Sequence, residues 1–221
     1  MHNMKAQFVL LATLFYLQNI SGQNMAGLRT GVLWNTIHDC MDDVDPGQGA
    51  APGVYGFMGW QLKTGRLFFQ VDMGVSQRNS RETSKGTSFI YFKKYRFKQI
   101  EWAFIGKYDL LPKIKPRIML NLGLMFGFAF AGREYIQGGS VGPTSVDEYR
   151  KIVFSQVQLK RLQVGPMLGF DVAWPFWKGE IISDIRYAYY RENEVLHCDR
   201  MHERRLCLSL GYRWLFQKDA G

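Results

Sequence analysis

Beyond its first 20 residues, the sequence has no continuous apolar segment of the ~20 residues that a membrane-spanning helix needs. It also lacks an RNA- or DNA-binding motif, and its 28 Lys and Arg residues are scattered among alternating segments. These absences argue against a helical membrane protein and against a nucleic-acid partner. The formal net charge of +9 still suits another anionic partner, such as a surface of lipid headgroups.

The N-terminus is the one place with a continuous apolar run. Lys5 precedes the run FVLLATLFYL (residues 8–17), and the small-residue segment QNISGQ (18–23) follows it. This order is typical of a secretory signal peptide, although a buried strand or helix is the alternative. We predict a signal peptide over residues 1–22 and a mature domain over residues 23–221. No cysteine lies at the junction, so we expect no lipoprotein anchor.

The most informative stretch is RIMLNLGLMFGFAFAGR, residues 117–133. Every second residue from Ile118 to Phe130 is large and apolar, whereas the other register is small and carries only one amide. Alternation with period two indicates a β-strand. The stretch is longer than the ~5–6 residues of an ordinary strand and long enough for the ~9–11 residues of a tilted transmembrane strand. We interpret it as a strand with one face in lipid and one face in a crowded interior.

Seven further segments are expected to be strands, and in all but residues 53–62 the alternation shows which register is apolar. In chain order, the eight expected strands are residues 26–37, 53–62, 67–78, 95–109, 117–133, 159–174, 180–190 and 204–216. Long polar links follow the first, third, fifth and seventh strands, including expected loops over 38–52, 79–94 and 134–158, and short turns follow the others. Pro166 suggests a bulge or break. We therefore predict an all-β fold, an eight-stranded antiparallel up-and-down transmembrane β-barrel, in the bacterial outer membrane with both termini periplasmic.

Four phrases carry a resemblance to a known family: GLRTGVLWN (27–35), QIEWAFIGKYDL (99–110), EIISDIRYAYY (180–190) and LCLSLGYRWLF (206–216). They resemble the PorT-like family of bacterial outer-membrane β-barrel proteins, known mainly from Bacteroidetes. The resemblance implies an eight-stranded barrel. One branch of the family is associated with secretion and gliding machinery.

The register opposite the apolar one contains charges of both signs. An eight-stranded barrel has an interior only wide enough for side chains, where isolated charges are costly. We therefore expect a lumenal network of paired charges that fills the barrel, with a proton or ion path as the alternative. The predicted members are Arg29, Asp72, Glu101, Lys107, Asp171, Asp184, Arg186 and Arg213.

A second group of basic residues follows the third strand. Cations at the outer rim of such a barrel attract the phosphates of lipopolysaccharide, although a solvated loop is an equal alternative. The lipopolysaccharide-facing candidates are Arg78, Arg81, Lys85, Lys93, Lys94 and Arg96. We expect outer-membrane lipid and lipopolysaccharide as partners of a monomer, with no cofactor.

The predicted function is that of a small non-porin outer-membrane barrel with a structural or interaction role, linked to secretion or envelope machinery if the resemblance extends that far. It is not predicted to be an enzyme. One alternative is an outer-leaflet lipid A-modifying enzyme, for which Ser76 and Ser80 are the only candidate nucleophiles near a histidine-bearing loop. The other is a soluble periplasmic ligand-binding barrel, which would turn its apolar side chains inward.

Three histidines and two cysteines of the mature chain fall in the first and last long loops, which barrel closure makes neighbours. His38 and Cys40 lie in one, and His197, Cys198 and His202 in the other. Export to an oxidising surface permits a Cys40–Cys198 disulfide. The competing interpretation is a zinc site that includes His38, His197 and His202, since Cys and His together suit zinc. Unrelated surface histidines and free thiols are the third interpretation.

The disulfide is directly testable. Thiol labelling of the unreduced protein should modify neither Cys40 nor Cys198, and labelling after reduction should modify both. In the chain-entropy model so long a closed loop contributes on the order of 4–5 kcal/mol, less any strain, so the reduced protein should unfold at lower denaturant concentration. Equal labelling of both thiols before and after reduction would exclude the bridge.

Overall fold

The computed structural model describes residues 21–38, 44–62, 65–85, 89–140, 145–152, 161–192 and 201–217. In these ranges the strands are β1 (Ser21–His38), β2 (Val44–Leu62), β3 (Leu67–Lys85), β4 (Phe89–Asp109), β5 (Arg117–Ser140), β6 (Ser145–Lys151), β7 (Leu162–Phe176), β8 (Gly179–Glu192) and β9 (Met201–Gln217). None of the described segments is a helix long and apolar enough to cross a membrane. The predicted signal peptide lies almost wholly outside these ranges, so its boundary stays a prediction.

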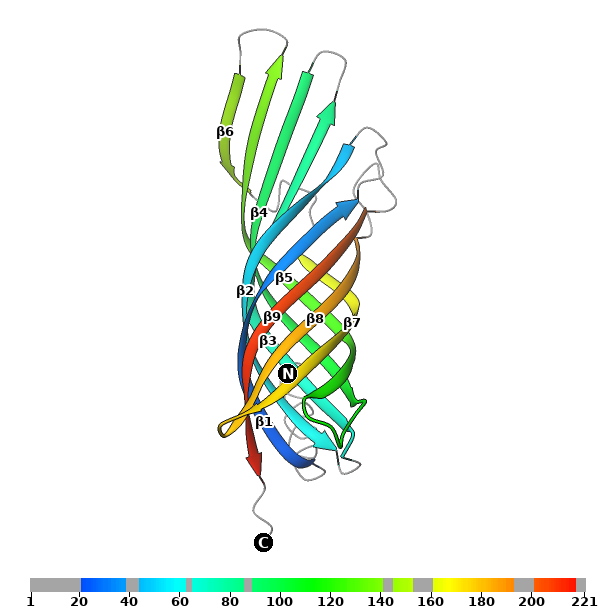
Figure 1. The fold of residues 1–221 in the computed structure, drawn as a ribbon. Helices are drawn as coiled ribbons and strands as arrows, with labels where there is room; N and C mark the ends of the chain where they lie inside the picture. Colours follow the sequence, from blue (N-terminus) through cyan, green and yellow to red (C-terminus); the bar gives the residue numbers. More distant parts are fainter. Residues whose placement is uncertain are drawn as a thin grey trace, which may run out of the picture.

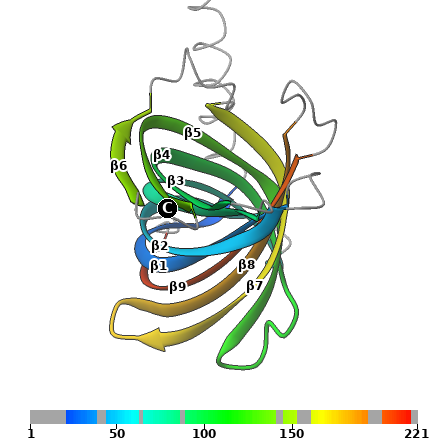
Figure 2. The same cartoon turned by 90° about the horizontal axis from the view of Figure 1, so that it is seen from above.

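Eight of the strands close into one barrel. Hydrogen-bonded neighbours follow the order β4-β3-β2-β1-β9-β8-β7-β5, and a further pairing of β4 with β5 joins the two ends. All of these pairings are antiparallel. Figures 1 and 2 show the resulting tilted cylinder from the side and from above. The predicted all-β, eight-stranded antiparallel barrel is therefore confirmed.

Strand β5 contributes to the barrel and to an extension above it. Its lower part pairs with β7 from Arg117↔Ala173 to Phe128↔Leu162, and its upper part pairs with β6 from Arg133↔Lys151 to Gly139↔Ser145. Its other edge pairs with β4 along almost its whole length. The alternation read from the sequence has the expected sense: Leu122 is 58% exposed on the outside, and Asn121 is fully buried inside.

The outer surface of the barrel is apolar. Met73, Leu210 and Leu28 are among many large hydrophobic side chains that are more than half exposed, and buried charged side chains lie on the opposite register. A barrel dissolved in water would be arranged the other way round, because exposing this much apolar surface to water is unfavourable. The arrangement suits a lipid environment, and it argues against the soluble ligand-binding barrel.

All three expected loops contain strand residues, and two of them, 79–94 and 134–158, are largely β-hairpins. Residues 79–94, expected to be a loop, belong mostly to β3 and β4, whose ladder continues from Asn79↔Arg96 to Lys85↔Ile90. The expected loop over 134–158 contains the upper part of β5 and all of β6, and β2 begins at Val44 inside the expected loop over 38–52. Figure 1 shows these strands rising beyond the closed part of the barrel. In these upper parts neither face of the sheet meets lipid, so the side chains no longer alternate between apolar and polar. The backbone ladder continues nevertheless. The strand ends predicted from hydrophobic alternation were therefore placed too early.

Pro166 neither breaks β7 nor causes a bulge. Its pairing with Leu124 of β5 continues without a register shift, and the ladder to β8 begins one residue later, at Met167↔Ala188. Proline lacks the N–H that a second ladder would use at this position. The irregularity in this part of the barrel lies instead between Lys98 and Gln99 of β4, opposite the extra residue Phe130 of β5.

The orientation of β5 predicts the effect of a charge on its outer face. Phe126 stacks on Trp102 of β4, with 5.7 Å between the ring centroids, near the middle of the apolar row. Phe126→Arg should therefore lower the free energy of unfolding by about 2–4 kcal/mol in denaturant titrations of the lipid-inserted protein. Phe126→Leu, which keeps the site apolar, is the control. Equal stability of the two variants would show that this face does not meet lipid.

Candidate functional site in the barrel lumen

The interior of the barrel is filled by charged and polar side chains. All eight predicted lumenal residues are buried: Arg29, Asp72, Glu101, Lys107, Asp171, Asp184, Arg186 and Arg213. Each lies on the inward register of its strand, because side chains two residues apart along a strand leave the same face. The structure divides them among three layers along the barrel axis.

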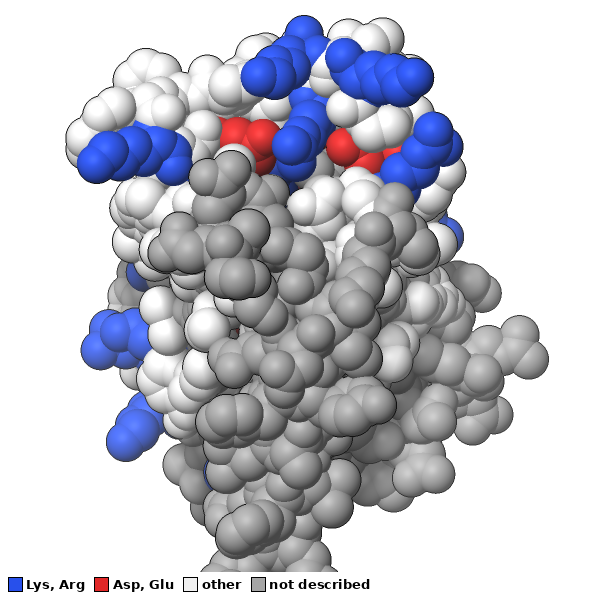
Figure 3. Space-filling view, turned by 90° about the horizontal axis from the view of Figure 1, so that it is seen from below, with Lys and Arg blue, Asp and Glu red and all other residues white. Residues whose placement is uncertain are grey.

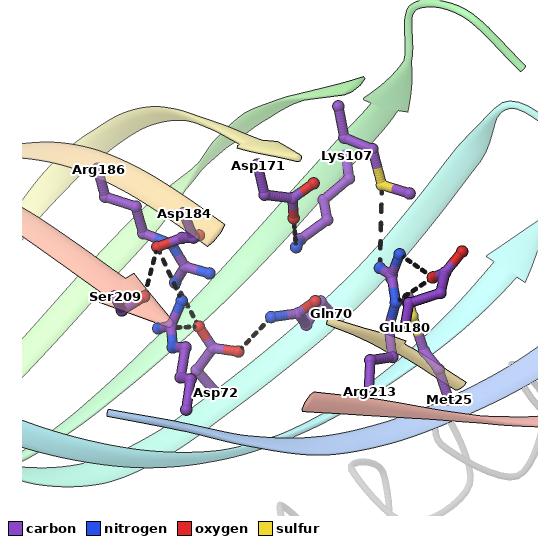
Figure 4. A network of polar contacts seen from close by, with 12 residues as sticks. Met25, Gln70, Asp72, Lys107, Asp171, Glu180, Asp184, Arg186, Ser209 and Arg213 are labelled. Atoms are coloured by element: carbon purple, nitrogen blue, oxygen red, sulfur yellow. Dashed lines mark hydrogen bonds and ion pairs between the residues drawn. The ribbon is translucent and has the colours of Figure 1, made fainter. Parts of the chain in front are cut away.

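The middle layer is a four-membered ring of alternating charge (Figure 4). Arg29 of β1 donates to Asp72 of β3 at 2.7 Å and to Asp184 of β8 at 3.2 Å. Arg186 donates to the same two carboxylates, with 2.6 Å between its Nε and Asp184. Ser209 donates to Asp184 at 3.0 Å, and Gln70 donates to Asp72 at 2.6 Å. The ring therefore ties three of the barrel strands, β1, β3 and β8, across the lumen, with further support from β9.

The lower layer lies toward the short turns (Figure 4). Arg213 of β9 forms two hydrogen bonds to Glu180 of β8, one of them 2.8 Å long from its Nε. Its other terminal nitrogen lies 3.6 Å from the sulfur of Met25 and 3.9 Å from that of Met119. Between this layer and the ring, Lys107 of β4 forms an ion pair with Asp171 of β7. These contacts join both sides of the barrel below the ring.

The upper layer is built around Arg205 of β9. Its guanidinium pairs with Glu101 of β4 and with Glu203, which lies 3.1 Å away. It also donates to Asn35 at 2.7 Å and lies over the ring of Tyr190, 4.7 Å from the centroid. Glu101 in addition accepts hydrogen bonds from Tyr55 and Gln99. The layer closes the lumen below the hairpin extension.

Arg78 is the main correction among the predicted site residues. It was predicted to face lipopolysaccharide at the rim, but its side chain is buried in the lumen and pairs with Glu203 at 2.7 Å. The prediction was wrong because it grouped Arg78, the last residue of the expected third strand, with the basic residues of the loop that follows and did not apply the alternation of the strand to it. Gln70, Asp72 and Ser76 share its register, so continued alternation places Arg78 inside as well.

Arg205 and Glu203 were missed at the start of the last strand. Arg205 is the second residue of the expected strand 204–216 but was left out of its inward register, and Glu203 precedes that strand. The expected last strand began at residue 204, whereas β9 begins at Met201. The inward register of Cys207, Ser209 and Arg213, continued by two steps toward the N-terminus, reaches both residues. Extending alternation through polar ends of strands is thus the signal that would have found the whole upper layer.

Other predicted site residues are distributed as follows. Lys94 and Arg96 are exposed on the outer face of β4, and the side chains of Arg81, Lys85 and Lys93 lie outside the described part. Ser76 is buried and accepts a hydrogen bond from Gln99 at 3.0 Å, whereas the side chain of Ser80 is not among those described. Neither candidate therefore tests the enzyme alternative.

The predicted disulfide and metal site stay predictions. Cys40, Cys198 and His197 lie outside the described residues. The backbone ladder pairs His38 of β1 with His202 of β9, as expected for the closing seam. Among the described residues no group of three or more metal-ligating side chains converges. Cys207, the third cysteine, is a buried free thiol on the inward face of β9.

The buried charges of this lumen neutralise one another. Six buried cationic side chains and seven buried carboxylates are present among the described residues, so neither sign dominates. Buried charges are stable only when they are paired and hydrogen-bonded. Such an interior supports a plug better than a wide ion path.

Comparison with known proteins supports the fold of this chain and shows nothing about its function. No protein-family model matches the chain, and no curated protein matches it. Among solved structures, the outer membrane protein OprG from Pseudomonas aeruginosa aligns with a TM-score of 0.50 and 8% identity, covering 90% of this chain and 98% of that one. Neisserial surface protein A (TM-score 0.42, 15% identity, 86% and 97% covered) and a major outer membrane protein from Thermus thermophilus (0.41, 12%, 86% and 99%) also align. At these identities the likeness is one of fold alone.

The ring of charges predicts a large stability effect. Asp72→Asn removes the carboxylate that Arg29 and Arg186 share, and it leaves both guanidinium groups buried beside a neutral amide. Breaking a buried pair in this way should cost about 3–5 kcal/mol, measured as a shift of the denaturant midpoint for the lipid-inserted barrel.

Glu148→Gln is the matched control for that experiment. Glu148 lies on β6, where a hydrogen bond from Arg150 lowers the pKa of its carboxyl group. Because this pair is exposed to solvent, its loss should leave the midpoint unchanged. A midpoint for Asp72→Asn that equals that of Glu148→Gln would contradict a stabilising role for the ring.

Proposed function

We propose that the chain is a small non-porin barrel of the bacterial outer membrane with a structural or interaction role. One observation supports this most: a lumen filled by paired charges lies inside a wall whose outer face is apolar. The wall provides the means to stay in lipid, and the paired charges of the three layers fill the lumen, which favours a plugged barrel over a solute path. What the protein presents to its surroundings is then its outer surface and its two ends.

The proposed orientation has the hairpin extensions outside the cell and both termini in the periplasm. Support comes from the asymmetry of the ends, since outer-membrane barrels carry long segments outside and tight turns in the periplasm. Charge does not distinguish the ends. Seen from the short-turn end, Lys and Arg side chains outnumber the acidic ones on the part of the surface that is described (Figure 3). Arg66, Lys113, Lys115 and Lys178, which belong to the short turns, are all exposed.

A link to secretion or envelope machinery is the finer part of the proposal. It depends on the resemblance to PorT-like barrels, and the phrases that carry it lie in the barrel wall. The phrase EIISDIRYAYY supplies Glu180, Asp184 and Arg186 to the lumenal layers. Residues of this kind maintain a barrel and do not identify a protein partner. We propose a monomer without a cofactor and without an enzymatic role.

The sealed lumen predicts no large conductance. In planar lipid bilayers the purified protein should give no stable single-channel steps of porin size, because the narrow barrel is filled by side chains. A heat-dependent change in electrophoretic mobility and resistance of the barrel to protease would establish that the protein had inserted. Stable porin-sized steps from inserted protein would overturn the proposal.

A further inference from the structure

The outer face of the β4–β5–β6 extension carries an unusual row of like charges. Arg96 of β4 is directly opposite Arg133 of β5, and Arg133 is directly opposite Lys151 of β6. All three side chains are exposed. On the inner side of the same strands Phe97 and Ile152 pack together in an apolar cluster, so the cations share the outer face. Three adjacent strands therefore present three cations in one row.

Such a row destabilises the sheet unless something compensates it, because like charges directly opposite each other repel. Among the described side chains no carboxylate forms an ion pair with Arg96, Arg133 or Lys151. Glu148 alternates with Tyr149 and Lys151 along β6, so its side chain leaves the opposite face of the strand, where it pairs with Arg150 at 2.5 Å. Because water and salt ions screen such exposed charges only in part, a bound anion would stabilise this row.

A second row, one pleat further out, adds aromatic rings. Lys94, Tyr135 and Tyr149 are directly opposite one another on the same three strands. The two tyrosine rings lie 4.5 Å apart, and the ammonium group of Lys94 is 5.7 Å from the Tyr135 centroid. Tyr149 is 79% exposed. Exposed tyrosine offers an apolar ring face together with a hydroxyl group, a combination suited to a ligand that is both apolar and polar.

The position of the two rows limits the ligand further. Below them comes the exposed Lys98 of β4 opposite Ala131 of β5, and beyond this pair the outer face becomes apolar, with Ile100 and Trp102 on β4 and Phe128 on β5. A ligand that touches all three zones has phosphate groups for the cations, rings for the tyrosines and hydrocarbon for the apolar wall. Guanidinium groups bind phosphate through paired charge-assisted hydrogen bonds.

We propose that Arg96, Arg133 and Lys151, with Lys94, Tyr135 and Tyr149, form a site for the phosphorylated saccharide headgroup of lipopolysaccharide. This inference rests on the proposed outer-membrane location, with the extension at the outer leaflet. It differs from a general attraction between a basic rim and a membrane, because it depends on one wall of the barrel. Arg133, Lys151 and both tyrosines belong to residues that the sequence pattern left at a strand end or in a loop.

The test uses the full-length barrel in vesicles of zwitterionic phospholipid. Lipopolysaccharide is added at several salt concentrations, and its binding is compared between the native protein and a triple variant, Arg96→Gln with Arg133→Gln and Lys151→Gln. Binding should fall about tenfold or more in the variant, as expected for the loss of charge-assisted hydrogen bonds to phosphate, and its dependence on salt should flatten. Enzymatically dephosphorylated lipopolysaccharide should bind the native protein about as weakly as the intact form binds the variant.

Arg204→Gln is the matched control. Arg204 is exposed on β9, across the barrel from β4, and also lies just above an apolar outer row that begins at Leu206. Its replacement should leave binding unchanged. An equal loss of binding in this variant, or an unchanged affinity in the triple variant, would overturn the site in favour of general charge attraction. The same conclusion would follow if the native protein bound vesicles rich in phosphatidylglycerol as tightly as it binds lipopolysaccharide.

A second measurement does not depend on the ligand. In zwitterionic detergent the triple variant should unfold at the same or a higher temperature than the native protein, because it removes repulsion within the row. A lower unfolding temperature would mean that the three cations support the fold and would overturn the inference. Failure of the native protein to insert into vesicles would instead refute the proposed membrane location, so the two failures are distinguishable.

Discussion

Pairing of charge across the lumen is the interaction on which the rest of the barrel depends. Closing eight strands removes their inward side chains from water, and the inward register of this chain contains arginines and carboxylates in nearly equal number. Most of these charges are tolerated because an opposite charge reaches them from another strand. Arg29 and Asp184, for example, are 155 positions apart in the chain and meet only when the barrel is closed. The pairs thus favour closure in this register over an open or slipped sheet, because a slip of one residue would turn the charges toward lipid.

The same alternation has different consequences at different heights. In the closed part, its outward members are apolar and its inward members are charged, so the pattern is visible in the sequence. Above that part, β3 to β6 continue as a wall whose backbone ladder goes on where the hydrophobic alternation has ended. The wall has one clear physical oddity, the row from Arg96 to Lys151, in which the ladder places like charges side by side. A structural barrel would gain nothing from such a row, which is why an external anion is the simplest source of compensation.

The filled lumen and the basic wall together suggest which parts of the protein are available for function. Its interior is neutralised internally and offers little to a solute, whereas its exterior offers an apolar belt and an uncompensated cationic face. Function is then expected at the surface, in contacts with lipid and with partners at the two ends. The likeness to solved outer-membrane barrels supports the architecture and is silent on those contacts.

The sequence by itself determined the fold class, the number of barrel strands and the direction in which most side chains point. This was possible because alternate side chains leave opposite faces of a strand, a property of the backbone that needs no tertiary information. It placed all eight predicted lumenal residues on the inward register. It missed Glu203, which precedes the expected last strand, and the inward direction of Arg78 and Arg205, which lie at strand ends where the hydrophobic contrast is weak. Only the tertiary structure decided which charges meet, since strand tilt and register bring Arg29 to Asp184 and Arg96 to Arg133. It also decided that β6 exists, because a strand polar on its outer face is stabilised by its ladder to β5 rather than by burial of a hydrophobic pattern.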